Sequence, residues 1–325
     1  MFEELMSKTV MVTGATGLIG QALVRRLLSL DCLVVAVVRN IEKAKTLFGK
    51  DRKISYIISD VTELDVKEHD VNYIVHAASN TSSKAFINDP VGVINTSIEG
   101  TRRTLEIARL SNVKGYVYLS SMEVYGTPTT DEKIDEQHGS NLNTMAPRSA
   151  YPESKRMCEN LCAAYASQYG VPAKVARLSQ TFGPGVQYND GRVFAEFARC
   201  VIENRNIILR TKGETKRSYL YTEDAVDAIL TILLNGTIGE AYNVTNEETY
   251  CSIYEMAQMV ANQCAAEKIK VVIKEEDISK YGYAPTLHMN LDTKKIRNCG
   301  WNPKYSFDDM IRNMITYMSE KGNLT

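Results

Sequence analysis

A glycine-rich turn near the N-terminus constrains the fold more than any other feature of the sequence. Gly14, Gly17 and Gly20 are spaced at intervals of three and directly follow the apolar run Thr9–Val12. The amphipathic pattern Gln21–Leu30 comes next, so the turn joins a buried strand to a helix. Glycine permits such a tight turn and lets a pyrophosphate approach the backbone at the positive end of the helix. The turn therefore predicts a dinucleotide-binding unit.

Short apolar runs alternate with helical patterns through the first half of the chain. Apolar strands separated by helices are typical of a parallel sheet that is covered on both faces. We therefore expect a doubly wound α/β fold, with a Rossmann domain over residues 1–182 and a smaller substrate-binding lobe over 183–325, the boundaries being interleaved. The expected strands are Thr9–Val12, Leu33–Val38, Ile54–Ile58, Tyr73–Val75, Tyr116–Leu119 and Lys174–Leu178, and the expected helices include Gln21–Leu30, Ile94–Leu110 and Tyr151–Tyr169.

The composition argues against several classes of function. The 38 basic residues nearly balance the 39 acidic ones, so no global field favours nucleic acid or an anionic membrane. No apolar run reaches the roughly 18 residues of a membrane span, and the acidic N-terminus does not resemble a signal peptide. The seven cysteines form no CxxC pair, which is typical of free thiols in a reducing cytoplasm. Cys158 and Cys162 have no histidine near them in sequence, so we expect no metal site.

The end of the second expected strand bears on the choice of cofactor. An acid at this position binds the ribose 2′-hydroxyl of NAD and repels the 2′-phosphate of NADP. This chain has Val37-Val38-Arg39-Asn40, which lacks an acid and supplies a planar, always charged guanidinium that suits phosphate. We therefore expect a preference for NADP(H), with NAD(H) as the alternative.

A tyrosine and a lysine one helical turn apart carry the expected chemistry. Tyr151 and Lys155 are spaced i,i+4, so both side chains project from one face of a helix that Pro152 begins. The free phenol has a pKa of about 10, and a nearby ammonium and helix N-terminus would lower that pKa. Tyr151 would then exchange a proton with an alcohol or ketone oxygen while a nicotinamide exchanges hydride with its carbon.

In this order, the motifs resemble those of the extended short-chain dehydrogenase/reductase family, which includes nucleotide-sugar epimerases, dehydratases, decarboxylases and reductases. The resemblance covers nearly the whole chain and implies an NAD(P)-dependent enzyme with a nucleotide-linked sugar or alditol as substrate. Besides the glycine turn and the Tyr151/Lys155 pair, it rests on Ser59-Asp60-Val61, on Val75–Ser79, on Asn95 in an N-x-x-x-E-G-T helix start, on Leu119–Gly126, on Arg177–Pro184, and on Arg217 ahead of Tyr221-Thr222-Glu223-Asp224.

The resemblance also implies roles for individual residues. Ser121 would hydrogen-bond the same substrate oxygen as Tyr151, and Lys155 would also hold the nicotinamide ribose. The implied cofactor-binding residues are Gly14, Thr16, Gly17, Leu18, Ile19, Gly20, Arg39, Asp60, Val61, Ala77, Ala78, Ser79, Tyr151, Lys155 and Leu178. The implied substrate-binding residues are Ser79, Met122, Gln180 and Arg217.

The residues after Ser121 narrow the reaction. The 4,6-dehydratases of the family have an Asp-Glu pair there, whereas this chain has Met122-Glu123, and a thioether cannot protonate a leaving hydroxyl. Uronic-acid decarboxylases retain that glutamate without the aspartate, so Glu123 is either a catalytic residue or a structural acid bonded to backbone. Gln180 replaces the family's usual asparagine, which remodels the pocket, and Arg217 matches the arginine that pairs with the nucleotide diphosphate.

Three functions remain open. Arg39 and the missing dehydratase aspartate favour an NADPH-consuming reductase of a nucleotide-linked keto sugar or ketose, such as one that makes a CDP-alditol for capsule polysaccharide. The alternative is an epimerase or decarboxylase with tightly held NAD, which returns its hydride within one turnover. A non-catalytic dinucleotide-binding regulator is disfavoured because Ser121, Tyr151 and Lys155 are all present.

Two of the expected helices also carry apolar residues at helical spacing. The helices are Ile94–Leu110 and Tyr151–Tyr169, and the second includes Leu161, Ala164 and Tyr165. In the family, the equivalent pair forms a four-helix interface between two subunits. We therefore expect a homodimer, although burial within one subunit would explain the same spacing.

Overall fold

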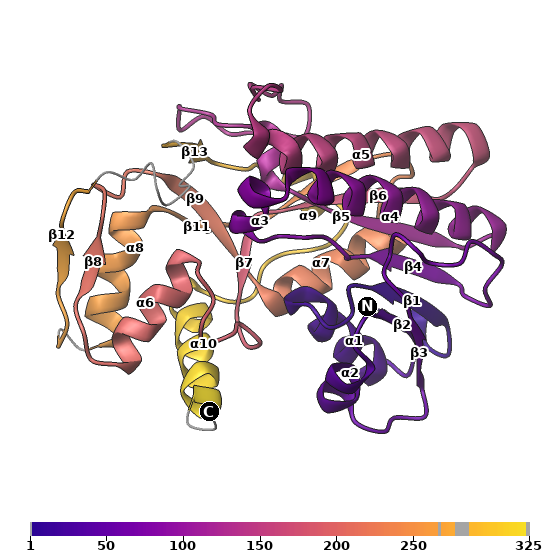
Figure 1. The fold of residues 1–325 in the computed structure, drawn as a ribbon, viewed down its shortest axis with the longest axis horizontal. Helices are drawn as coiled ribbons and strands as arrows, with labels where there is room; N and C mark the ends of the chain where they lie inside the picture. The colour runs from indigo at the N-terminus through magenta and orange to yellow at the C-terminus, as the bar shows by residue number, and fades with distance from the viewer. Residues whose placement is uncertain (1, 266–267, 277–285, 323–325) are drawn as a thin grey trace.

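A seven-stranded sheet forms the centre of the protein in the computed structural model, which describes residues 2–265, 268–276 and 286–322 (Figure 1). Every pairing between neighbouring strands is parallel. The predicted doubly wound α/β fold is therefore confirmed, and each predicted strand agrees with the structure to within two residues at either end. From one edge to the other, the strands are β10 (Ala241–Val244), β6 (Ala173–Leu178), β5 (Gly115–Ser121), β4 (Tyr73–His76), β1 (Thr9–Thr13), β2 (Leu33–Val38) and β3 (Ile54–Ile58).

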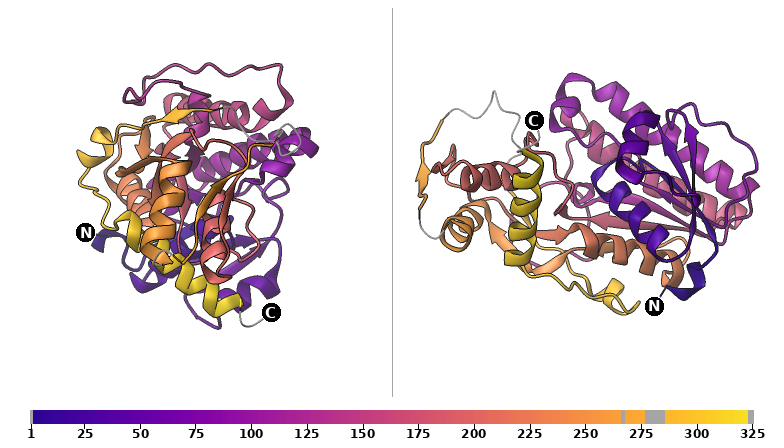
Figure 2. Two further views of the ribbon diagram at one scale, coloured as in Figure 1. Left: turned by 90° about the vertical axis from the view of Figure 1, so that its left-hand side faces the viewer. Right: turned by 90° about the horizontal axis from the view of Figure 1, so that it is seen from below.

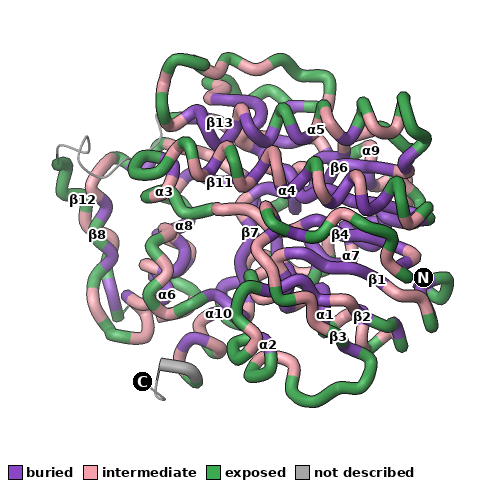
Figure 3. The backbone as a smooth tube through the Cα atoms, turned by 45° about the vertical axis from the view of Figure 1, so that its right-hand side comes forward, coloured by how far each residue is buried: buried purple, intermediate pink, exposed green. Residues whose placement is uncertain are grey.

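Helices cover both faces of this sheet. Side chains alternate along a strand, so Val10 and Met11 of the first strand point to opposite faces. Val10 lies in one apolar cluster with Leu23 and Ile229, whereas Met11 lies in another with Leu105. Figure 3 shows the strands buried between these layers. The first face is covered by α1 (Leu18–Ser29), α2 (Ile41–Phe48) and α7 (Thr222–Asn235), and the second by α4 (Pro90–Leu110) and α5 (Ala150–Tyr169).

A smaller lobe with its own apolar core lies beside the sheet (Figures 1 and 2). Phe182 and Phe194 stack at 4.8 Å between ring centroids in this core, and Met256 and Met310 are fully buried there. Its strands are β7 (Gln180–Phe182), β9 (Lys216–Tyr221), β11 (Asn246–Ser252) and β13 (His288–Met289) in one sheet and β8 (Ile207–Leu209) and β12 (Val271–Ile273) in another. Its helices are α6 (Val193–Ile202), α8 (Ile253–Met259), the π-helical turn η4 (Val260–Cys264) and α10 (Phe307–Gly322).

The chain crosses between the sheet and the lobe more than once. It enters the lobe at β7, returns to the sheet as α7 and β10, and leaves again as β11. The division of the chain at residue 182 into a cofactor-binding domain and a substrate-binding lobe therefore stays a prediction, with interleaved boundaries. The remaining short elements are η1 (Glu3–Leu5), α3 (Ser83–Asn88), η2 (Met122–Tyr125), η3 (Pro147–Ser149) and α9 (Lys294–Arg297).

Two findings bear on the predictions from composition. All seven cysteines are free thiols. Over the described ranges, no helix has both the length and the apolar character that crossing a membrane requires.

Candidate active site

The glycine turn packs directly against the end of the neighbouring strand β4. Gly14 has a φ of +66°, and a Cβ there would lie 2.8 Å from the backbone of Ala77 and Ala78. A Cβ on Gly20 would lie 2.1 Å from the Gly14 carbonyl oxygen. Gly17 begins α1 without a side-chain cap, so the first N–H groups of the helix remain available to an anion. The turn has the close backbone approach that a pyrophosphate site needs; the other predicted residues of the turn, Thr16, Leu18 and Ile19, are half-buried.

A buried hydroxyl fixes the segment that follows β4. The Thr13 Oγ accepts the Ala78 N–H at 3.1 Å and lies 2.7 Å from Nδ1 of His76. Burial lowers the pKa of His76 to about 3, so this imidazole is neutral. In the described part of the chain, the buried Ser79 hydroxyl has no hydrogen-bond partner. Because buried polar groups are normally paired, this hydroxyl fits a ligand that lies against the segment.

Two of the implied cofactor-binding residues, Arg39 and Asp60, form an ion pair. Asp60 accepts hydrogen bonds from the Thr62 N–H at 3.0 Å and the Thr62 hydroxyl at 2.8 Å. Arg39 Nη1 lies 3.6 Å from Asp60 Oδ2, and the Arg39 side chain is 81% exposed. The Thr62 hydrogen bonds, and then the Arg39 charge, lower the pKa of Asp60. Val61 is buried against Gly100 of α4.

Ser121, Tyr151 and Lys155 come together at the carboxyl end of β5. Ser121 ends the strand, Tyr151 lies at the start of α5, and Ser121 lowers the pKa of the Tyr151 phenol. The Lys155 Nζ donates to the Leu119 carbonyl oxygen at 2.7 Å and lies 5.7 Å from the centre of the Tyr151 ring. Tyr151 and Lys155 are only 6% and 3% exposed. Three of the four predicted catalytic residues therefore lie at the end of β5 and the start of α5, with Tyr151 and Lys155 buried and Ser121 partly exposed.

The pKa of Tyr151 differs from the sequence prediction. We expected Lys155 and the helix N-terminus to lower it, but burial and then the Glu123 charge raise it, against weaker lowering effects of Ser121, Arg148 and Arg192. The Lys155 ammonium is directed to a strand carbonyl instead, and burial lowers its own pKa to about 8. The prediction was wrong because it omitted the cost of placing a phenolate in a buried position.

We expect Lys155→Met to stabilise the protein at neutral pH. Folding lowers the pKa of this lysine from 10.5 to about 8, which corresponds to a penalty of about 3 kcal/mol that is fully present below pH 8. Between these two pKa values the unfolded chain binds more protons, so wild-type stability rises with pH relative to the variant. Thermal unfolding of both proteins at several pH values tests this, and an advantage of the variant that does not shrink above pH 8 contradicts it.

Two side chains that we did not predict lie against the catalytic tyrosine. Phe86 of α3 stacks on Tyr151 with 4.3 Å between centroids and 15° between the rings. Arg148 of η3 places Nη1 3.2 Å from Glu123 Oε2, so the Glu123 carboxylate is paired with a side chain, while its N–H donates to the Ser121 hydroxyl. No sequence signal pointed to Phe86, and the one signal for Arg148 was its place one turn before Tyr151.

The predicted substrate residues lie on two sides of the site. Gln180 of β7 and Arg217 of β9 are neighbours, because Arg217 Nη1 lies 3.4 Å from Gln180 Oε1. Within the described residues, the buried Arg217 Nε has no hydrogen-bond partner, which fits an anionic group of a ligand. Met122 is buried in an apolar cluster with Tyr125, and Leu178 is buried at the end of β6.

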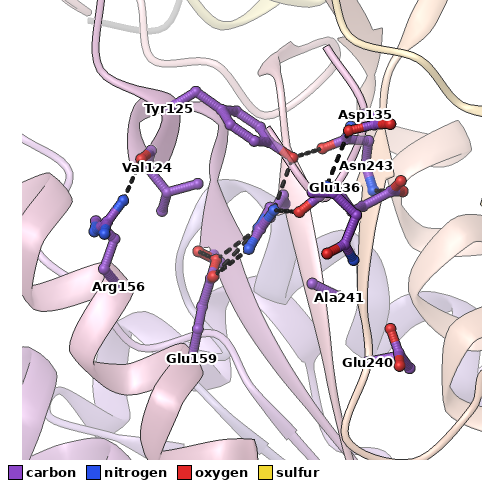
Figure 4. A network of polar contacts seen from close by, with 12 residues as sticks. Val124, Tyr125, Asp135, Glu136, Arg156, Glu159, Glu240, Ala241 and Asn243 are labelled. Carbon is purple, nitrogen blue, oxygen red and sulfur yellow. Dashed lines mark hydrogen bonds and ion pairs between the residues drawn. The ribbon is translucent and has the colours of Figure 1, made fainter. Parts of the chain in front are cut away.

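A polar network holds the η2 turn that carries Glu123 (Figure 4). Tyr125, the last residue of η2, donates to the Asn243 side chain at 2.7 Å and accepts from Arg177 Nη1 at 2.8 Å. Arg177 Nη2 lies 2.7 Å from Glu159 Oε2, and Glu159 also accepts from the Ser120 hydroxyl at 2.5 Å. The network thus joins β5, α5, β6 and β10 directly behind the catalytic group.

A comparison with protein families accounts for this arrangement. The model of the NAD dependent epimerase/dehydratase family matches residues 10–245, which include the glycine turn, the catalytic group and Arg217. The chain belongs to this family. It is therefore an extended short-chain dehydrogenase/reductase enzyme that uses a nicotinamide dinucleotide.

Relatives of this epimerase/dehydratase family member include two decarboxylases. UDP-glucuronic acid decarboxylase 1 of Danio rerio is 28% identical over 322 residues, which cover 97% of this chain and 73% of that protein. UDP-N-acetyl-alpha-D-glucosaminuronate decarboxylase of Bacillus cytotoxicus is 28% identical over 332 residues, covering 98% of this chain and all of that protein. Among solved structures, the epimerase Mth375 of Methanothermobacter thermautotrophicus has a TM-score of 0.84 at 22% identity, covering 99% of this chain and 95% of its own.

Proposed function

We propose that this family member is a decarboxylase of a UDP-linked uronic acid. The observation that carries the proposal is the position of Glu123, whose N–H donates to the Ser121 hydroxyl at 3.2 Å, while Met122, at the place of the dehydratase aspartate, is buried. The two decarboxylase relatives support this reading. They favour the epimerase or decarboxylase alternative over the NADPH-consuming reductase, and no relative that we compared supports a CDP-alditol product or a role in capsule synthesis.

Decarboxylation of a uronic acid needs a ketone next to the carbon that bears the carboxylate. A bound nicotinamide dinucleotide would supply the chemistry for this, since its ring can accept a hydride from C4 and give it back at the end of the cycle. The positive charge of a bound NAD⁺ would favour the phenolate and oppose the effect of burial on the Tyr151 pKa, so that Tyr151 could accept the C4 hydroxyl proton. Ser121 would hydrogen-bond the same oxygen. When the C5–C6 bond breaks, CO₂ leaves and its electron pair moves to the C4 oxygen, which Tyr151 and Ser121 stabilise. A proton then adds at C5, so the cycle leaves the dinucleotide unchanged.

Product analysis tests the proposal. The purified protein is incubated with NAD⁺ and UDP-glucuronic acid or UDP-N-acetylglucosaminuronic acid, and nucleotide sugars are followed by mass spectrometry. We expect loss of CO₂ from one of them and no net change in the nicotinamide absorbance. Stoichiometric oxidation of NADPH with a CDP-linked ketose would restore the reductase reading, and conversion of UDP-glucose into its C4 epimer would support an epimerase instead.

We propose that a dinucleotide binds to the residues at the glycine turn, after β4 and at the ends of β3 and β6. Arg39 would influence whether this dinucleotide is NADP⁺ or NAD⁺. We expect Arg39→Ala to weaken the binding of NADP⁺ by about 10-fold or more, because a charge-assisted contact to the 2′-phosphate is lost. NAD⁺, which lacks that phosphate, should bind nearly as before. Calorimetry with both dinucleotides measures this; equal losses for both would show that Arg39 acts through its ion pair with Asp60.

We also propose that the protein is a cytoplasmic homodimer that pairs through α4 and α5. The two helices pack side by side, and Met157 of α5 is 50% exposed while Leu161 and Tyr165 are half-buried. Light scattering at micromolar concentration should give twice the mass of the chain. Replacing Met157 and Ala164 by arginine should shift the protein to the monomer, because buried unpaired charges oppose association; an unchanged mass contradicts this interface.

A further inference from the structure

Arg148 lies against the catalytic group without a role in the reaction derived so far. It belongs to the short turn η3, three residues before Tyr151. Its Nη1 lies 3.2 Å from Glu123 Oε2, and its guanidinium carbon lies 5.9 Å from the centre of the Phe86 ring, which in turn stacks on Tyr151. The Arg148 and Glu123 side chains are 32% and 28% exposed. The guanidinium is thus held in place and is still accessible.

The other cations near the phenol are already engaged. Lys155 is buried and donates to a carbonyl oxygen of β5. Arg192 is paired with Asp190 through three contacts, of 2.6, 3.0 and 3.2 Å. In the described part of the chain, Arg148 makes one hydrogen bond, to Glu123, so most of its five N–H donors are unused. The Glu123 charge raises the pKa of Tyr151 and the Arg148 charge lowers it.

The reaction that we propose brings the carboxylate of the uronic acid close to the Glu123 carboxylate. The ketone forms at C4, at the Tyr151 phenol, and the carboxylate is borne by the adjacent C5. An unpaired Glu123 would repel that carboxylate, because like charges at close range disfavour each other in a partly buried site. A guanidinium with free donors beside Glu123 removes this repulsion and offers a planar fork that matches a carboxylate.

We propose that Arg148 binds the carboxylate of the uronic acid and thereby selects uronates over neutral sugars. The inference rests on the proposed function, and it adds the residue that recognises the group to be lost. Phe86 contacts the guanidinium through a cation–π interaction, which helps to hold the free donors of Arg148 near Tyr151. Arg148 is then a specificity-determining residue that is shared between Glu123 and the substrate.

Binding measurements that do not depend on turnover test this inference. The holoenzyme with NAD⁺ is prepared in a Tyr151→Phe background, and calorimetry gives Kd for UDP-glucuronic acid and for UDP-glucose, which lacks the carboxylate. Arg148→Gln should raise the Kd for UDP-glucuronic acid by about 10- to 100-fold and change the Kd for UDP-glucose by less than about twofold. Arg156→Gln is the matched control, because it removes an ion-paired arginine of the following helix α5 and should change neither Kd.

A second variant is expected to have the opposite effect. Glu123→Gln removes the competing acid and the repulsion, so UDP-glucuronic acid should bind more tightly while UDP-glucose is unaffected. If Arg148→Gln weakens both ligands equally, Arg148 only supports the local structure and the inference is overturned; it is likewise overturned if neither ligand changes. If Arg148→Gln selectively weakens the binding of UDP-glucuronic acid but the wild-type enzyme releases no CO₂, the carboxylate site is supported and the proposed decarboxylase activity is rejected.

Discussion

Tyr151→Phe is expected to lower kcat by about 10²- to 10⁴-fold, because it removes the proton-transferring group from the reacting oxygen. The stack on Phe86 at 4.3 Å depends on the ring and not on the hydroxyl, so the fold should be retained. Turnover of the UDP-linked uronic acid measures the loss, and calorimetry with the dinucleotide shows whether the cofactor site is intact.

A tyrosine on the same helix provides the control for this variant. Tyr169 lies at the end of α5 and is 50% exposed, so Tyr169→Phe should leave kcat unchanged. A Tyr151→Phe enzyme that keeps more than about a tenth of the wild-type kcat would assign the proton transfer to another group. Reduced cofactor binding with normal kcat would mean that the phenol serves the dinucleotide rather than the sugar.

Arg177→Met is expected to have the largest effect on stability. Arg177 and Glu159 are 14% and 12% exposed and lie 2.7 Å apart, so the variant leaves a largely desolvated carboxylate without its charge partner. Breaking a buried pair in this way costs about 3–5 kcal/mol. Urea unfolding at neutral pH measures the free energy of unfolding. Arg156→Met removes a far more exposed ion pair, with Glu153, and should cost less than about 1 kcal/mol.

A double variant separates the lost charge partner from lost packing. Adding Glu159→Leu to Arg177→Met removes the unpaired carboxylate, and most of the stability should return, because an apolar pair of similar volume often replaces a buried ion pair at little cost. If the double variant is as unstable as Arg177→Met, the loss comes from the contacts of Arg177 with Tyr125 and the Glu136 carbonyl oxygen instead.

The sequence was sufficient to predict six of the seven strands of the large sheet, because each of them is a short apolar run between helical patterns. It did not predict β10 (Ala241–Val244), which follows the first elements of the smaller lobe. The glycine turn and the Tyr151/Lys155 pair were also readable, since each consists of residues that are close in sequence and act together. Arg148 and Glu123, by contrast, are 25 residues apart in sequence and meet through η2 and η3, two short turns without periodicity. Phe86 lies in α3, a helix of six residues that no sequence pattern predicted.

The direction of the Tyr151 pKa shift shows a second reason for failure. Sequence spacing correctly placed Lys155 one turn after Tyr151, but the depth of both side chains in the folded protein decides which electrostatic effect dominates. That depth depends on α3 and on Glu123, which reach the phenol from other parts of the chain. Neighbours within one helix can be predicted from spacing, whereas burial by distant segments cannot.

The return of the chain to the large sheet as β10 has a consequence for how the protein is made. Strand β6 is complete at residue 178, but its outer neighbour β10 begins only at Ala241. Until the ribosome has released that segment, β6 presents an unpaired edge, and the face that α7 covers with Ile229 and Leu233 is bare. Closing this long loop is slow compared with local helix formation. We therefore expect the nascent chain to expose this edge and this apolar face, both of which favour aggregation, until residue 244 has emerged.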